Sequence, residues 1–129
     1  FYGILGTNER EHPWMDEGLN SMNENRYIET KYPKRTLIGT DSIINNGPMK
    51  WFDIAHYKHK ASYELTYLLN ASRNLDQPIE FKAAEYSSLN YGGIVYAKTA
   101  IAFDYLMAYL GEKLYDKCMQ RYFEEWKFL

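Results

Sequence analysis

The sequence predicts an all-α fold of about four main helices, folded as a single helical subdomain over residues 1–129. Apolar side chains recur at helical spacing, most clearly between Leu114 and Trp126. Clusters of proline and glycine separate the helical stretches, as is typical of turns between helices. No stretch shows the alternation of apolar and polar residues that indicates a half-buried strand. A chain of 129 residues is also long enough to bury a core.

The first helix is expected from Pro13 to Lys31. A proline is tolerated in the first helical turn, and Pro33 marks the end because the residue before a proline avoids the helical conformation. Asp16 adds negative charge where the helix dipole favours it. One face of this helix carries polar side chains at i, i+3, i+4 and i+7, which are Glu17, Asn20, Ser21 and Glu24. By its spacing alone, such a stripe is typical of a solvated helix face.

A long irregular connection is expected over residues 32–51, which contain two prolines and an Asn-Gly pair. A second helix is expected from about Asp53, a residue suited to the N-cap, to about Asn74, with a loop over 75–87 after it. His56 and His59 lie three positions apart without a third ligand nearby, so a solvated face is favoured over a metal site. The predicted core stripe of this helix is Ala61, Leu65, Leu68 and Leu69.

The third helix is expected from about Ser88 to Gly111, where glycine provides a C-terminal stop. It is apolar nearly all round, which predicts a buried position. The fourth helix, from about Glu112 to Phe128, is amphipathic, and Cys118 on its apolar side is expected to be a buried structural thiol. The single glycine between the two helices predicts an antiparallel helical hairpin.

Composition and charge exclude several classes of function. The formal net charge is -2, and the lysines and arginines are scattered, so a nucleic-acid partner is not expected. No run of about eighteen apolar residues is present, so no membrane segment is expected in this chain. Aromatic residues make up 17% of the chain, with thirteen tyrosines, which suits the wall of a cleft or an interface. No Gly-x-Ser-x-Gly motif indicates a serine hydrolase.

The run Trp14-Met15-Asp16-Glu17-Gly18-Leu19-Asn20-Ser21 resembles the Trp-Leu-Asn-Glu-Gly-Phe-Ala-Ser segment of the aminopeptidase N family of zinc metallopeptidases, the gluzincins. The resemblance implies that Glu17 is the third zinc ligand. In that family the other two ligands are histidines of a His-Glu-x-x-His helix, separated from this glutamate by eighteen residues. Sixteen residues precede Glu17 here. The family spacing therefore places the second zinc histidine three positions before Phe1, so this chain is expected to be a fragment starting just after that motif.

A second segment, Val95-Tyr96-Ala97-Lys98-Thr99-Ala100, resembles x-Tyr-x-Lys-Gly-Ala of the same family, with Thr99 where the family usually has glycine. The resemblance implies that Tyr96 donates a hydrogen bond to the oxyanion of the tetrahedral intermediate. Glu24 resembles a family carboxylate that hydrogen-bonds a zinc histidine and holds its tautomer. The interval from Glu17 to Tyr96 is longer than in the family, which predicts an insertion between Lys31 and Asp53.

The resemblance implies the helical C-terminal half of a thermolysin-like catalytic domain, in a zinc-dependent aminopeptidase that hydrolyses the N-terminal bond of a peptide substrate. The catalytic base and the two histidines would lie upstream of this chain, so the isolated fragment is expected to be inactive and not to hold zinc tightly. Two alternatives remain open, a non-catalytic helical interaction domain and a pseudo-enzyme of the same fold. An apolar face left uncovered in the fragment predicts self-association.

Overall fold

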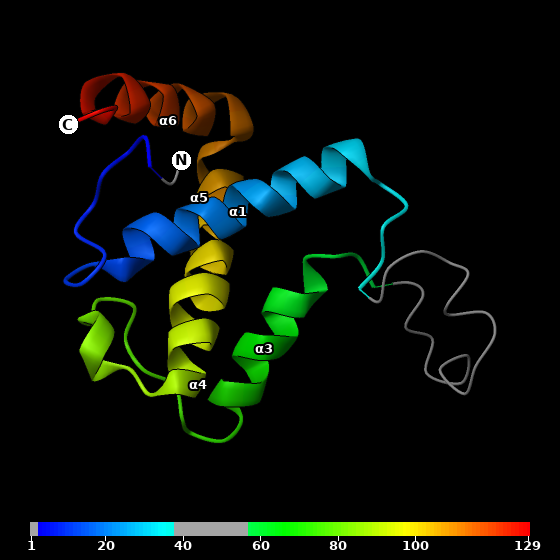
Figure 1. The fold of residues 1–129 in the computed structure, drawn as a ribbon. Coiled ribbons are helices and arrows are strands. Elements are labelled where there is room, and N and C mark those ends of the chain that lie inside the picture. Colours follow the sequence, from blue (N-terminus) through cyan, green and yellow to red (C-terminus); the bar gives the residue numbers. More distant parts are fainter. Residues whose placement is uncertain (1–2, 38–56) are drawn as a thin grey trace.

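The structure is a computed structural model that describes residues 3–37 and 57–129. The described part of the chain is helical and contains no β-strand, only isolated bridges such as Leu5 to Lys127. Four long helices account for most of it (Figure 1), which confirms the predicted all-α fold. In chain order the elements are α1 (Pro13–Lys31), α3 (Ala61–Ala71), the 3₁₀ turn η3 (Ala83–Glu85), α4 (Ser88–Asn90), the π-helix η4 (Tyr91–Lys98), α5 (Thr99–Leu110) and α6 (Glu112–Trp126).

The central feature of the fold is the crossing of α1 over the continuous helical rod made by α4, η4 and α5 (Figure 1). The predicted bounds of the first helix are confirmed, with Pro13 in its first turn and the Tyr32 N–H donating to the Ile28 oxygen at its end. At the crossing, Met22 of α1 packs with Ala100 of α5 and with Tyr115 of α6. All three are at least nine-tenths buried, so this contact forms one of two buried clusters, and the other is made by Tyr86, Ile94 and Val95.

The predicted third helix is confirmed in extent, but its middle is a π-helix that the sequence did not indicate. Gly111 ends α5 with φ 79° and ψ 142°, and α6 begins at the next residue. The predicted antiparallel hairpin is wrong, because Figure 1 shows α6 lying across the end of α5 instead of returning beside it. One connecting residue leaves no room for the loop of about 2–5 residues that reverses a chain between antiparallel helices.

The second predicted helix begins later than expected. Residues 57–60 are described and not helical, α3 starts at Ala61, and Asp53 lies outside the described residues. Of the predicted core stripe only Ala61 is buried, whereas Leu65 and Leu68 are 49% and 56% exposed and Leu69 is similarly exposed. The side of α3 that meets η4 instead buries a polar residue, Asn70, whose amide would collide with any side chain at Gly93.

Two burial predictions for the C-terminal helices are also wrong. The second half of α5 is not buried, since Tyr105 is 73% and Tyr109 is 87% exposed. Cys118 on α6 is exposed as well. The physical reason is that α1 crosses α5 near Ala100 and covers only its first half (Figure 1). These uncovered apolar side chains are where the predicted self-association would take place, and that remains a prediction.

The start of α1 is held by a later loop. His12 and Trp14 both hydrogen-bond the carboxylate of Glu80, and the Ala83 N–H donates to the Arg10 oxygen at 2.9 Å. The Lys82 ammonium also forms an ion pair with a carboxylate of the same N-terminal segment. These contacts determine where the first turn of α1, and therefore Glu17, lies.

Across residues 3–37 and 57–129, no helix is both long enough and apolar enough to cross a bilayer.

Candidate functional site

Helix α1 lies tightly against η4 and the first residue of α5 at Gly18, directly after Glu17. A Cβ atom at Gly18 would lie 2.2 Å from the Thr99 Cγ2 and 2.9 Å from the Val95 oxygen. Both distances are far below a normal contact, so no residue with a side chain fits without movement of one helix. Thr99 is almost completely buried at this contact. Glycine therefore lets the first turns of α1 press against η4 and bring the Glu17 side chain to the π-helix.

Glu17 and Tyr96 meet at this contact. The Tyr96 hydroxyl lies close enough to the Glu17 carboxylate for the two groups to interact, although the residues lie 79 positions apart (96 minus 17). Burial raises the pKa of Tyr96 far above its ordinary value of 10.0, and the nearby carboxylate of Glu17 raises it further. Tyr91 and Glu9 add smaller contributions in the same direction. The two residues predicted from separate motifs are thus brought together.

The π-helix arranges the surroundings of Tyr96. A π-helix has hydrogen bonds that span five residues. The same spacing continues at Thr99, whose hydroxyl donates to the Ile94 oxygen, five residues earlier, at 2.9 Å. In an α-helix, side chains five positions apart point about 140° away from each other, so Tyr91 and Tyr96 would not meet. Here their ring centroids are 6.0 Å apart. Ring contacts continue through a row of aromatic side chains at intervals of five positions, which are Phe81, Tyr86, Tyr91 and Tyr96.

Lys98 of the second motif has a structural partner in the loop after α3. Its ammonium lies 2.7 Å and 2.9 Å from the two carboxylate oxygens of Asp76 and donates to the Gln77 oxygen at 2.9 Å. It also lies above the ring of Tyr67 on α3. Lys98 therefore anchors this loop and α3 to the end of η4, next to Tyr96.

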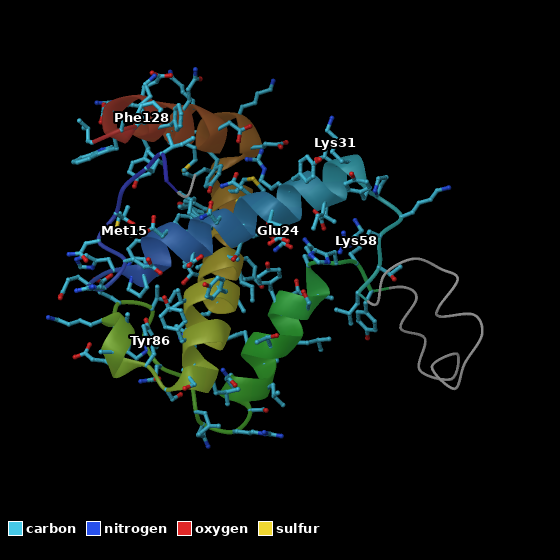
Figure 2. The ribbon with its side chains drawn as sticks, in the orientation of Figure 1. Met15, Glu24, Lys31, Lys58, Tyr86 and Phe128 are labelled. Atoms are coloured by element: carbon cyan, nitrogen blue, oxygen red, sulfur yellow. The ribbon has the colours of Figure 1, made fainter. Side chains whose placement is uncertain are left out.

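Glu24 lies two helical turns beyond Glu17, about 10 Å along the axis at the usual helical rise. Figure 2 shows it near the middle of α1, on the side toward α3. Its carboxylate accepts a hydrogen bond from the Tyr63 hydroxyl of α3 at 3.1 Å. Burial raises the pKa of Tyr63, and the charge of Glu24 adds to this effect. Glu24 is therefore held by α3 and is not part of the contact between Glu17 and Tyr96.

Glu17 fits the role of one zinc ligand, because a partly exposed carboxylate oxygen is a donor that zinc accepts. A zinc site needs at least three protein ligands, and the described residues contain no group of three or more histidine, cysteine, aspartate or glutamate side chains placed to hold a metal. His12 is bound to Glu80, and His59 makes an edge contact with Tyr63. His56 lies outside the described residues.

Comparison with protein-family models, with curated proteins and with solved structures gave no match for this chain. Any function assigned to it must therefore come from the two motifs and from the contact between them. Three residues at that contact were not predicted, namely Gly18, Tyr91 and Glu9. Only Gly18 carried a signal in the sequence, since a glycine inside a helical stretch often indicates close backbone approach.

Proposed function

We propose that this chain is the part of a zinc-dependent aminopeptidase that supplies the third zinc ligand, Glu17, and the oxyanion donor, Tyr96. The observation that carries the proposal is the close contact of α1 with η4 at Gly18, which brings the Glu17 carboxylate within interaction distance of the Tyr96 hydroxyl. Each was predicted from a different motif, and an unrelated helical fold gives no reason for the two motifs to touch. Glu24, further along α1, is proposed to hydrogen-bond a zinc histidine, as the family resemblance implies.

The chemistry of Tyr96 suits an oxyanion donor. A phenol with the ordinary pKa of 10.0 is already protonated near neutral pH, and burial raises the pKa of Tyr96 further, so its hydroxyl donates a hydrogen bond without carrying charge. The edge contact with Tyr91 restricts the position of its ring. A donor held in place before the reaction loses little free energy to reorganisation, which is the basis of stabilisation in an oxyanion hole. Zinc, when bound, would polarise the scissile carbonyl and lower the pKa of a bound water.

Glu17 supplies a single carboxylate, so the rest of the zinc site must come from residues outside the described part. The family resemblance assigns two histidines, the catalytic base and the groups that recognise a free amino terminus to such residues. The 129-residue chain alone is therefore expected to bind zinc weakly and not to cleave peptides. Chelator-sensitive peptidase activity from the isolated chain would contradict this part of the proposal.

The test uses the product of the complete reading frame, assayed on aminoacyl anilides. Tyr96→Phe is expected to lower kcat by about 10²–10³-fold, the loss typical of one oxyanion-hole donor, with bound zinc and KM little changed. Glu17→Gln is expected to lose zinc. Tyr109→Phe is the matched control, because Tyr109 is highly exposed on α5. Unchanged kcat in Tyr96→Phe, or no zinc-dependent activity in the parent, would favour the interaction domain or the pseudo-enzyme.

A further inference from the structure

The segment 75–87, called the strap below, contacts both helices of the candidate site. Its Glu80 side chain hydrogen-bonds at the start of α1, and its Asp76 carboxylate pairs with Lys98 at the end of η4. Figure 1 shows the strap beside α4 and below the start of α1. One stretch of chain therefore connects α1 to η4, the two helices that carry the candidate residues.

Buried groups hold the strap to the start of η4. The Asn90 amide, which is almost completely buried, donates to the Leu75 backbone oxygen and to the Gln77 Oε1. The Tyr86 ring is also buried and lies edge-on to the ring of Tyr91, with centroids 6.1 Å apart. Buried hydrogen bonds and ring contacts of this kind resist rearrangement. The strap is therefore a fixed point relative to η4.

The strap meets the start of α1 through the Glu80 carboxylate. One of its oxygens bonds the His12 ring, and the other accepts a hydrogen bond from the Trp14 indole N–H. Trp14 lies three positions before Glu17, so the two side chains share one face of α1. The ion pair of Lys82 with the N-terminal segment is exposed and contributes little to stability. Glu80 therefore links the strap to the helical turn just before Glu17.

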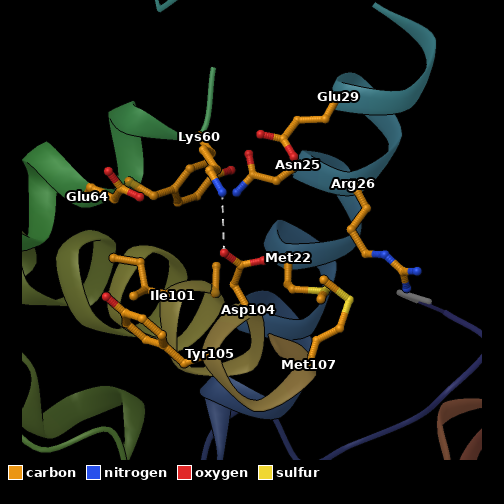
Figure 3. Close-up of a pocket in the computed structure, with 12 residues that line it drawn as sticks. Met22, Asn25, Arg26, Glu29, Lys60, Glu64, Ile101, Asp104, Tyr105 and Met107 are labelled. Carbon is orange, nitrogen blue, oxygen red and sulfur yellow. Dashed lines mark ion pairs between the residues drawn. The ribbon is translucent and has the colours of Figure 1, made fainter. Parts of the chain in front are cut away.

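The middle of α1 is held by contacts that do not involve the strap. Gly18 lies against η4 and α5, and Met22 packs against Met107 of α5 (Figure 3). Glu17 lies between this packed part of α1 and the first turn. The N–H groups of a first helical turn have no partners within the helix, so this turn frays most easily. Loss of the Glu80 contact is therefore expected to loosen the first turn and the Glu17 side chain without unfolding the core.

Glu80 itself is remote from the Tyr96 hydroxyl. Its charge adds to the effect of burial on the pKa of Tyr86, but Glu80 is not one of the main groups that raise the pKa of Tyr96. We propose that Glu80 is a positioning residue, which acts through Trp14 and the first turn of α1 to hold the Glu17 carboxylate near the Tyr96 hydroxyl. The consequence for zinc rests on the proposed function, whereas the effect on the contact between the two side chains does not.

The test is NMR of the 129-residue chain near neutral pH, with carbon-13 at the tyrosine Cζ atoms. The chemical shift of this atom responds to the groups that surround the hydroxyl. Glu17→Gln gives the change in the Tyr96 signal when the neighbouring carboxylate is lost. Glu80→Gln replaces one acceptor oxygen with an NH₂ group that cannot accept a hydrogen bond. It is expected to move the Tyr96 signal in the same direction by a smaller amount.

Two further variants separate the route through Trp14 from a general effect of charge. Glu85→Gln is the matched control, because Glu85 lies in the same strap and its carboxylate accepts from the Lys82 N–H at 2.9 Å, not from α1. It is expected to leave the Tyr96 signal unchanged. Trp14→Phe removes the indole N–H and keeps an aromatic ring, so it is expected to reproduce the effect of Glu80→Gln.

A double variant tests whether Glu80 acts through Glu17. Once Glu17→Gln has removed the carboxylate, Glu80→Gln is expected to cause no further change in the Tyr96 signal. An unchanged Tyr96 signal in Glu80→Gln, or the same change with and without Glu17, would overturn the proposal. An equal change in the signal of Tyr115, which is buried at the crossing of α1 and α5, would show a general structural role and would also contradict it.

The consequence for zinc is measured on the product of the complete reading frame. Glu80→Gln is expected to bind zinc about tenfold more weakly, the loss typical when a residue that orients a ligand is changed, and Glu85→Gln is expected to bind it normally. If the parent binds no zinc, the proposed function fails while the NMR result for Glu80 stands. If the parent binds zinc and Glu80→Gln binds it equally well with an unchanged Tyr96 signal, the positioning role fails while the proposed function stands.

Discussion

Gly18→Ala tests the close contact on which the candidate site depends. Helix propensity alone would make this substitution stabilising by about 1 kcal/mol, because alanine is a better helix former than glycine. The structure predicts the opposite. The added Cβ would lie 2.2 Å from the Thr99 Cγ2, roughly 1.5 Å closer than a normal carbon contact. Overpacking of a core costs about 1–3 kcal/mol, occasionally more, and an overlap of this size belongs at the upper end.

The expected net loss is about 2 kcal/mol in the free energy of unfolding, or about 6–10 °C in Tm for a chain of this length. The assay is urea denaturation followed by circular dichroism, with Gly92→Ala as the matched control. Gly92 lies in the same helical rod, and a Cβ there would meet nothing within 4 Å. The control is expected to be neutral or slightly stabilising. A Gly18→Ala variant as stable as Gly92→Ala would refute the proposed packing.

A double-mutant cycle identifies the partner in this contact. Thr99→Gly removes both side-chain carbons that would collide with the new methyl group at position 18. The substitution alone is expected to be destabilising, because Thr99 is buried and glycine is a poor helix former. In the double variant the losses should not add, with a coupling free energy of about 1 kcal/mol or more. If the losses in the free energy of unfolding add, Thr99 is not the residue with which the new methyl group of Gly18→Ala collides.

Two further predictions concern ionisation. Glu17→Gln is expected to lower the pKa of Tyr96, because it removes the negative charge that disfavours ionisation of the phenol. Burial still keeps that pKa above 10.0. An unchanged titration of Tyr96, followed by NMR, would show that the two side chains do not interact. Stability is expected to fall above about pH 10, because tyrosines with a raised folded-state pKa lose that advantage as the unfolded chain ionises first. Tyr96→Phe should make this alkaline loss shallower, and an equally steep loss would contradict the raised pKa of Tyr96. The tyrosines with raised pKa values are Tyr63, Tyr86, Tyr96, Tyr115 and Tyr122.

The bounds of the helices were predicted well where a proline or glycine near the end of a helix restricts the backbone locally. Pro13 and Pro33 restrict the backbone conformation of the residues next to them, so the bounds of α1 agree with the prediction. Gly111 ends α5 for the same local reason, through its positive φ of 79°. Burial was predicted less well, because it depends on what packs against a helix. Leu65 is at a helical core position in the sequence, yet α3 turns Asn70 toward η4 instead.

The sequence named Glu17 and Tyr96 as candidate site residues, and their role stays a prediction, but it did not indicate how the fold brings them together. Motif resemblance named Glu17 and Tyr96 as candidates, and the structure adds their proximity. The π-helix has no signal in a sequence pattern that is read with a period of 3.6, so the contact of Tyr91 with Tyr96 was not foreseen. Thr99, a departure from the family motif, proves to be the buried residue that packs against Gly18.

Glu17 and Tyr96 are proposed to belong to the site of a zinc aminopeptidase. The most direct measurement is to sequence the reading frame immediately upstream of the codon for Phe1. If Glu17 is the third zinc ligand, we expect a His-Glu-x-x-His motif with two residues between its second histidine and Phe1. A reading frame without these histidines would leave Glu17 without zinc partners and would contradict the claim, and a pseudo-enzyme or an interaction domain would then be the better account of this fold.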